Sequence, residues 1–222
     1  KDDFAVVEIG TNHFGEVDYL AKIANPNIGL ITNIGLSHLE FLKNLRGVLK
    51  EKTALLNNLT KPTIAILNAD DKLLKPIITQ RNKNMHVFSY GINEKSDFCA
   101  SMIRIREGRV EFKVNSKFDF ALSTLGDYNI YNALAAIAVS RILGLSYPEI
   151  AARLISFKFP KGRLNLIEYK GVRFIDDTYN SSPFACESAL KTLGEIKSKN
   201  GEGLPAGKAG RKIAILGDML EL

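Results

Sequence analysis

The strongest constraint on the fold is an alternation of short apolar runs with helical segments in the first half of the chain. Such alternation is typical of a parallel sheet with helices packed on it, because buried parallel strands read as nearly continuous apolar runs. We expect strands at residues 4–9, 28–34, 63–67 and 86–90, and helices at 16–24, 45–59 and 71–80. The fold class predicted is α/β, with a mostly parallel sheet flanked by helices.

The pattern changes in the second half. We expect a small antiparallel sheet from strands at 98–105, 109–114 and 118–122, with a tight turn at Glu107-Gly108, then helices at 129–143 and 147–157. The segment Phe159-Pro160-Lys161-Gly162-Arg163 has the composition of a domain junction. Beyond it we expect strands at 165–169, 172–176 and 212–216, a helix at 183–193 and a loop at 197–212. We therefore predict two domains, 1–162 and 163–222.

The composition is that of a globular protein, with 45% hydrophobic and 24% charged residues among 222. No run approaches the 18 or so apolar residues of a membrane-spanning helix, so we expect no membrane insertion. Cys99 and Cys186 form no disulfide or metal pattern, which fits the cytoplasm. The formal charge of +6 is spread along the chain, so we interpret it as solvated surface with a few phosphate contacts rather than a nucleic-acid site.

Two polar side chains lie at or just past the ends of predicted strands. Glu8 lies in the apolar run at 4–9, and His38 lies just past the run at 28–34. Ligands of parallel sheets bind outside the carboxyl ends of the strands. A carboxylate and an imidazole delivered to this one edge could share a hard cation.

Lys52 has an unusual position in the predicted helix at 45–59. At about 100° per residue, it falls within a stripe of Leu45, Val48, Leu49, Leu56 and Leu59, while Lys50 and Glu51 point away. Burial would lower the pKa of Lys52, and the neutral amine could react with carbon dioxide to form a carbamate. The alternative is a lysine that extends to solvent from the edge of the apolar face.

Asn129 and Asn132 open the predicted helix at 129–143. Three residues apart, they project from the same side. Together they could bind the edge of a purine. The alternative is a helix cap plus a surface asparagine.

Several motifs, in this order, resemble the central domain of the Mur ligase family, and within it the MurF branch. They are Glu8-Ile9-Gly10-Thr11-Asn12-His13-Phe14-Gly15-Glu16, Asn33-Ile34-Gly35-Leu36-Ser37-His38-Leu39-Glu40, Asn68-Ala69-Asp70, Gly126-Asp127-Tyr128-Asn129 with Asn132, Gly162-Arg163, Asp176-Asp177-Thr178-Tyr179-Asn180 and Gly217-Asp218-Met219-Leu220-Glu221-Leu222. The resemblance runs over essentially the whole chain. It implies the Mur ligase central fold, followed by the start of a Rossmann-like α/β domain.

The resemblance implies roles at matching positions. Glu8 and His38 match the residues that bind Mg²⁺, and Lys52 matches the lysine that is carbamylated. Asn129 and Asn132 match the region that contacts adenine. Arg163 matches the arginine that contacts the phosphates of ATP. Asp177 matches the aspartate that binds the ribose.

The resemblance also implies an activity, ATP-dependent amide ligation in peptidoglycan precursor synthesis. The enzyme would be cytoplasmic and monomeric. Its cofactors would be ATP and Mg²⁺, and its substrates UDP-MurNAc-tripeptide and D-alanyl-D-alanine, joined through an acyl phosphate. Lys52, His38 and Arg163 would act in catalysis. The alternatives are another Mur ligase, a folylpolyglutamate synthase-like ligase, or a non-catalytic nucleotide-binding module.

The sequence departs from the family pattern in places. Thr53-Ala54 stand where relatives usually show Gly-Glu, Phe41-Leu42 where they often show Gly-Phe, and Ser181-Ser182 where many keep Ala-Asn. No Gly-x-x-x-x-Gly-Lys-[Ser/Thr] phosphate loop is present. We therefore expect a fragment that lacks the P-loop, the N-terminal domain and most of the C-terminal domain, and that does not turn over by itself.

Overall fold

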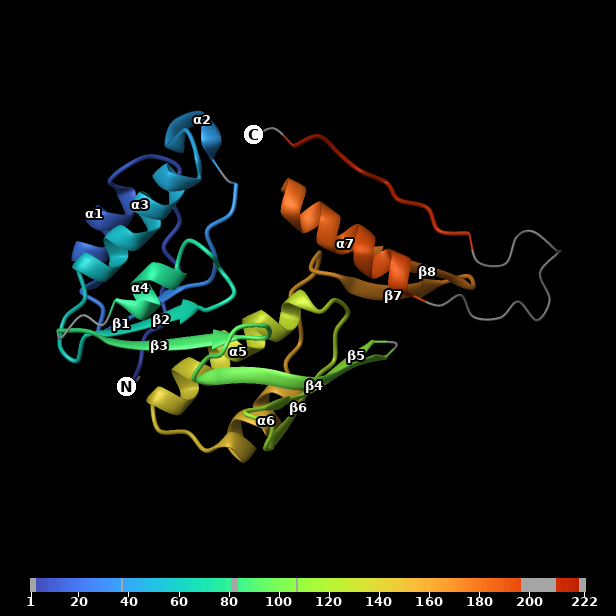
Figure 1. Cartoon of the computed structure of the whole chain (residues 1–222). Helices are drawn as coiled ribbons and strands as arrows, with labels where there is room; N and C mark the ends of the chain where they lie inside the picture. Colours follow the sequence, from blue (N-terminus) through green and yellow to red (C-terminus); the bar gives the residue numbers. More distant parts are fainter. Residues whose placement is uncertain (1–2, 37, 81–83, 107, 197–210, 220–222) are drawn as a thin grey trace.

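A single six-stranded sheet organises the larger part of the molecule (Figure 1). The computed structural model describes residues 3–36, 38–80, 84–106, 108–196 and 211–219. The sheet has the order β1-β2-β3-β4-β5-β6. The strands are β1 (Ile28–Ile31), β2 (Ile64–Asn68), β3 (His86–Gly91), β4 (Phe98–Arg106), β5 (Arg109–Val114) and β6 (Phe118–Leu122). Pairing is parallel from β1 to β4 and antiparallel from β4 to β6, which confirms the predicted mixed α/β fold.

Helices cover both faces of the sheet. They are α1 (Glu16–Ala24), α2 (Leu39–Leu42), α3 (Leu45–Asn57), α4 (Lys75–Thr79), α5 (Tyr128–Ile142) and α6 (Tyr147–Ile155). Alternate residues of a strand point to opposite faces. Accordingly, Ile66 of β2 packs with α5 and α6, whereas Ala65 and Leu67 pack with the side of α2, α3 and α4. The result is a three-layer arrangement with a core on each side.

Local sequence signals explain where several helices begin. The Asn44 side chain accepts hydrogen bonds from the backbone N–H groups of Arg46 and Gly47 at the start of α3. Ser146 and Glu149 form a capping box at the start of α6. The predicted helix at 71–80 is shorter than expected, because the Asp71 carboxylate binds the N–H groups of the next turn before α4 begins.

A second, two-stranded sheet and a helix follow residue 162. β7 (Asn165–Tyr169) and β8 (Val172–Asp176) form the predicted hairpin, and α7 (Pro183–Glu195) follows. The hairpin turns at Lys170 and Gly171, which both have positive φ, as a two-residue turn with the twist of the strands requires. An ion pair of 3.1 Å between Lys191 Nζ of α7 and Asp127 Oδ2 connects this unit to the start of α5.

Two of the predicted strands are absent from the structure, so these two predictions are wrong. Residues 4–9 and 212–216 form no strand, and most of their apolar side chains are exposed, Val6 to 90% and Ile215 to 93%. An apolar run becomes a strand only when a neighbouring strand takes up its backbone hydrogen bonds. Among the described residues, β1 pairs with β2 alone, and neither run joins the sheet or the β7–β8 hairpin.

Two further expectations fall partly outside the described residues, namely the turn at Glu107-Gly108 and the loop at 197–212. Within the part of the chain that the structure describes, no helix is both long enough and apolar enough to cross a membrane.

Candidate functional site

Lys52 lies on α3 and is half-buried, as the apolar stripe predicted. Its Nζ donates a 3.1 Å hydrogen bond to the backbone carbonyl of Asn33, which follows β1. Burial lowers the pKa of Lys52 below its ordinary value, and the negative charge of Asp71 opposes this effect without cancelling it. A lowered pKa makes the neutral amine more accessible, and the neutral amine is the form that can become a carbamate.

Asp71 orders the sheet edge around Lys52. It follows β2, and its Oδ2 accepts a 2.6 Å hydrogen bond from the N–H of Ile34, in the segment after β1. Its Oδ1 accepts from the N–H of Leu73 at 2.9 Å. The ends of two neighbouring parallel strands are thus joined beside the amine, at the edge where parallel sheets bind ligands.

His38 stands at the start of α2, a short helix that the sequence pattern did not predict. The residue is half-buried, and its backbone is left-handed, with φ of 52°. Its carbonyl accepts from the N–H of Leu42 at 2.9 Å, which closes the turn. Left-handed backbone is uncommon outside glycine, although histidine adopts it more readily than most residues.

Glu8 is the candidate whose setting differs from expectation. Its side chain is exposed, and an extended segment carries it instead of the predicted buried strand. The structure describes no group of three or more His, Cys, Asp and Glu side chains that could hold a metal ion. The donor set of Glu8, His38 and Lys52 therefore fits a hard cation only once a carbamate supplies oxygen donors at Lys52.

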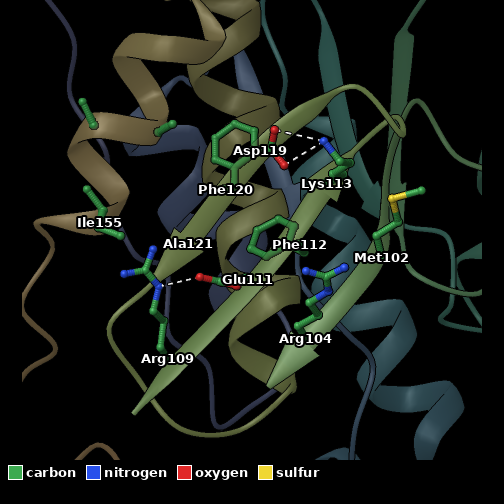
Figure 2. Close-up of a pocket in the computed structure, with 12 residues that line it drawn as sticks. Met102, Arg104, Arg109, Glu111, Phe112, Lys113, Asp119, Phe120, Ala121 and Ile155 are labelled. Carbon is green, nitrogen blue, oxygen red and sulfur yellow. Dashed lines mark hydrogen bonds and ion pairs between the residues drawn. The ribbon is translucent and has the colours of Figure 1, made fainter. Parts of the chain in front are cut away.

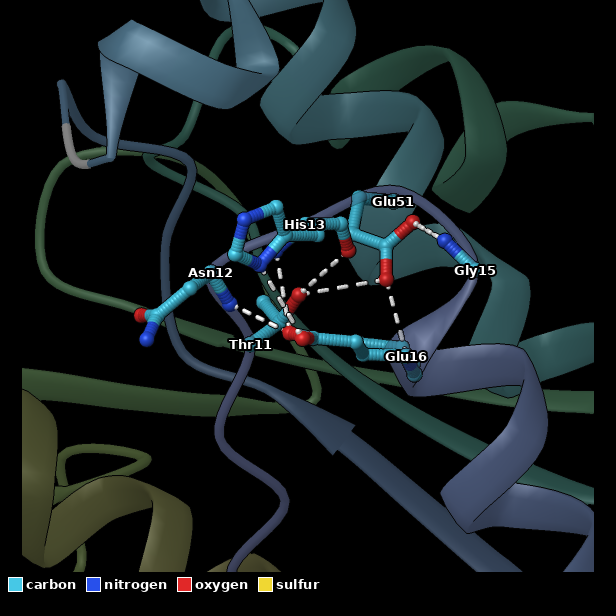
Figure 3. A network of polar contacts seen from close by, with 7 residues as sticks. Thr11, Asn12, His13, Gly15, Glu16 and Glu51 are labelled. Atoms are coloured by element: carbon cyan, nitrogen blue, oxygen red, sulfur yellow. Dashed lines mark hydrogen bonds and ion pairs between the residues drawn. The ribbon is translucent and has the colours of Figure 1, made fainter.

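Glu51 was predicted to point away from the apolar stripe of α3, yet it is buried as well. Its side chain is 3% exposed and receives three hydrogen bonds from the segment at 11–17 (Figure 3). The donors are the hydroxyl of Thr11 at 3.2 Å and the N–H groups of Gly15 at 2.7 Å and Val17 at 2.8 Å. Besides the face that packs on the sheet, α3 thus has a second buried face, which contacts α1.

A second carboxylate closes the same segment on itself. Glu16 Oε2 accepts from the N–H groups of Asn12 at 2.6 Å and His13 at 2.9 Å. These backbone donors lower the pKa of Glu16 to about 2. The His13 ring also lies against the Phe41 ring, with centroids 4.1 Å apart. Residues 11–16 therefore have a fixed shape next to α2.

Asn129 and Asn132 lie near the start of α5 and differ in exposure. Asn129 is buried, and its Nδ2 donates to the carbonyl of Leu125 at 2.8 Å and to Thr124 Oγ1 at 3.2 Å. Its Oδ1 accepts from Asn132 Nδ2 at 3.1 Å. Asn132 is exposed, so its amide is the one of the two that can reach a ligand.

Arg163 and Asp177 are brought together at the start of the β7–β8 hairpin. Asp177 Oδ1 accepts from the N–H of Leu164, the residue after Arg163, at 3.1 Å. The Arg163 guanidinium lies over the Tyr179 ring, 4.0 Å from its centroid. Burial raises the pKa of Tyr128 to about 12, with Asp177 and Asp127 adding to the effect and Arg163 opposing it. Both candidates therefore lie within electrostatic range of the first turn of α5.

Glycine is required where these segments meet. Gly126 has φ of +80°, and a Cβ there would come within 2.8 Å of the Tyr128 ring and 3.1 Å of Leu164. Gly162 has φ of +74°, and a Cβ there would come within 3.0 Å of the backbone nitrogen of Tyr179. Both positions combine a left-handed backbone with a close approach, which only glycine accommodates well.

Two cavities lie in the described structure, and neither is lined by a site residue that the sequence predicted. A shallow cavity of about 530 Å³ lies on the antiparallel part of the sheet, next to α6 (Figure 2). Four of its charged residues form ion pairs, Arg109 with Glu111 and Lys113 with Asp119, each at 2.8 Å. Another cavity, of about 410 Å³, is lined by Gly10, Thr11, Asn12, Glu16, Tyr19 and Leu20.

Comparisons with known proteins agree with this architecture. The family profile described as the Mur ligase middle domain matches residues 1–140. The chain is 32% identical to a UDP-N-acetylmuramoyl-tripeptide--D-alanyl-D-alanine ligase of Bacillus subtilis (strain 168), over 99% of this chain and 45% of that protein. It thus spans about half the length of the curated relatives it matches.

Two solved structures show the same fold. A crystal structure of MurF from Acinetobacter baumannii superposes with a TM-score of 0.81 and 31% identity, covering 87% of this chain and 43% of that one. MurF ligase from Thermotoga maritima in complex with ADP gives 0.76 and 27%, covering 89% and 47%. With a family profile that matches more than half of its residues and a fold shared with these structures, the chain belongs to the Mur ligase family.

Proposed function

We propose that the protein containing this chain is an ATP-dependent amide ligase of the MurF type, which joins D-alanyl-D-alanine to UDP-MurNAc-tripeptide. The observation that carries the proposal is the similarity along 99% of the chain to proteins of that name, together with the shared fold. The ADP complex of the Thermotoga relative supports a nucleotide as ligand.

In the proposed reaction, the terminal carboxylate of the tripeptide attacks the γ-phosphorus of ATP, which forms an acyl phosphate and releases ADP. The amine of D-alanyl-D-alanine then attacks the acyl carbon, and the tetrahedral intermediate collapses with loss of phosphate and a proton. Catalysis of this kind depends on positioning and on neutralising charge.

The metal half of the proposed site consists of Glu8, His38 and a carbamylated Lys52. A divalent cation such as Mg²⁺, when bound there, would supply positive charge against the phosphate and acyl oxygens. The chain's own contribution is to hold Lys52 half-buried against the carbonyl of Asn33, with a lowered pKa. This setting favours the neutral amine that carbamate formation needs.

The nucleotide half of the proposed site lies where the two predicted domains meet, near residue 162. Asn132 would contact adenine directly, while Asn129 would hold the Asn132 amide in place. Arg163 would contact the phosphates, and Asp177 the ribose. The arrangement supports this division of roles, because Asp177 is bonded to the backbone beside Arg163.

The test is a ligase assay on the full-length protein, with phosphate release measured in the presence of both substrates, ATP and Mg²⁺. We expect Lys52→Ala to lower kcat by at least about a hundredfold, the scale seen when a group that stabilises the transition state is removed. The matched control is Lys50→Ala, an exposed lysine on the same helix, which should keep activity. Equal activity in the two variants would contradict the role of Lys52, and an inactive wild type would contradict the function.

A further inference from the structure

Glu51 carries a buried negative charge for which the roles proposed so far give no use. Burying a carboxylate is costly unless hydrogen bonds compensate. Glu51 is 3% exposed, and its compensating donors all come from the segment at 11–17, more than thirty positions earlier in the chain. The carboxylate therefore adds a buried polar link between two parts of the chain that also meet where α1 packs on α3 and where Asn58 Nδ2 donates to Asp18 Oδ1 at 2.9 Å.

The two joined parts carry candidate metal ligands. Glu51 is the residue immediately before Lys52 on α3, and the segment at 11–17 begins three residues after Glu8. The same segment contacts α2 through the ring of His13 on the ring of Phe41, and Phe41 lies three residues after His38. Residues 11–17 thus lie among the elements that carry all three candidates.

Hydrogen bonds within the segment at 11–17 also fix its shape. Glu16 accepts hydrogen bonds from the N–H groups of Asn12 and His13, so residues 12–16 form a closed loop. Gly15 has φ of +91° and donates its N–H to Glu51 Oε2. The hydrogen bonds of Glu51 therefore hold this loop, which begins a few residues after Glu8, in a fixed place relative to α3.

We propose that Glu51 is a positioning residue that sets the spacing between Glu8 and Lys52 for a divalent cation. The inference rests on the proposed function for the meaning of these two residues. Groups that orient metal ligands typically change metal affinity 10–100-fold when they are replaced.

Glutamine at position 51 is a sharp probe because it keeps the shape of the side chain and removes one acceptor. Glu51 Oε1 receives the Thr11 hydroxyl and the Val17 N–H, and Oε2 receives the Gly15 N–H. In Glu51→Gln, the new NH₂ group must face at least one backbone N–H, which leaves two donors opposed. The hydrogen bonds between α3 and the segment at 11–17 should therefore weaken, while the volume of the side chain stays nearly the same.

A purely structural role would also destabilise the protein when it is lost, so a control must separate the two effects. Val48→Ala provides it, because Val48 is fully buried on the same helix and packs in the core beside the sheet, away from the segment at 11–17. This change lowers stability through lost packing alone.

The experiment measures Mn²⁺ binding by electron paramagnetic resonance in the presence of ADP, on full-length wild type, Glu51→Gln and Val48→Ala, with melting temperatures recorded in parallel. We expect Glu51→Gln to weaken Mn²⁺ binding by about 10–100-fold, and Val48→Ala to bind Mn²⁺ like wild type despite its lower melting temperature. In ligase assays, Glu51→Gln should need more Mg²⁺ for half-maximal rate, with KM for D-alanyl-D-alanine unchanged.

The outcomes separate the inference from the proposed function. Glu51→Gln that binds Mn²⁺ like wild type, or equal losses in both variants, would overturn the positioning role, as would a wild type without bound Mn²⁺. A wild type that binds Mn²⁺ and ADP but forms no product from the two peptide substrates would instead overturn the proposed function. In that case the binding difference between the variants still decides the inference.

Discussion

Glu16 is a single residue with a clear pH signature. Its pKa is lowered from 4.5 to about 2, chiefly by the backbone N–H of Asn12 and then by that of His13. A carboxylate with a lower pKa in the folded state stabilises the fold above its unfolded pKa, and this contribution is lost as the pH falls toward the folded pKa.

We therefore expect Glu16→Gln to lower the melting temperature at neutral pH, where the full contribution is present. The difference from wild type should be constant above pH 4.5 and should shrink as the pH falls toward about 2. Thermal unfolding followed by circular dichroism between pH 2 and 7, values that bracket the expected transition, measures this difference. A difference that stays constant down to the lowest pH would contradict the assignment.

Lys52 gives a second prediction for a single residue. Because its pKa is lowered by burial, a larger share of its amine is neutral at a given pH than for an exposed lysine. With ¹³C-labelled carbon dioxide, we expect one carbamate resonance that is absent in Lys52→Ala and retained in Lys50→Ala. A signal that survives Lys52→Ala would place the carbamate elsewhere.

The two neighbouring residues on α3 show what the sequence could predict about the site. The stripe around Lys52 follows from helical periodicity alone, and the structure confirms its partial burial. Glu51 lies outside that stripe, and its burial depends on α1 packing against α3. No local pattern reports such a contact. The Gly15 and Val17 donors that satisfy Glu51 are backbone groups, which the sequence does not distinguish.

At the scale of elements, the contact between α2 and α3 depends on Gly47. A Cβ at this position would come within 1.9 Å of the Leu42 carbonyl oxygen, a backbone atom that cannot turn aside. We expect Gly47→Ala to destabilise the protein by about 1–3 kcal/mol or more, as overpacking does. Chemical denaturation measures the loss.

Gly194 in α7 provides the matched control, because a Cβ there meets nothing within 4 Å. Alanine favours helix over glycine, so Gly194→Ala should stabilise the protein by up to about 1 kcal/mol. A gain of stability in both variants would show that helix propensity, and not the contact with Leu42, governs position 47.

Elements with a strong internal pattern were predictable. The helix at 16–24 and the strands at 109–114, 118–122, 165–169 and 172–176 have the predicted bounds. The apolar runs at 4–9 and 212–216 have strand composition as well, yet they form none. Composition indicates that a run can be buried, but a strand also needs a partner edge, and a partner is a property of the assembled fold.

At the scale of the whole molecule, the two unpaired runs leave apolar side chains exposed at both ends of the described chain. Phe4 is 60% exposed, and Ile213 and Leu216 are 68% and 62% exposed. Contiguous exposed apolar surface promotes association. We expect the 222-residue chain, prepared by itself, to bind a hydrophobic dye and to self-associate as its concentration rises.

Light scattering coupled to size-exclusion chromatography measures this association. Val6→Ser with Ile215→Ser, at the two most exposed of these positions, should reduce it while the melting temperature stays close to that of the unmodified chain. If the double substitution leaves the association unchanged, the surface that mediates it lies elsewhere, and the β7–β8 hairpin is the next region to test.

The saturated amide of Asn129 has a consequence for how nucleotide preference would drift among variants. Since both ends of that amide are occupied by Thr124, Leu125 and Asn132, its orientation is inherited from the loop ahead of α5. A change at Thr124, which touches no ligand in this scheme, would propagate through the buried amide and tilt the exposed one. Under the proposed function, selectivity between purines would then change without a substitution at Asn132, the residue proposed to contact the base.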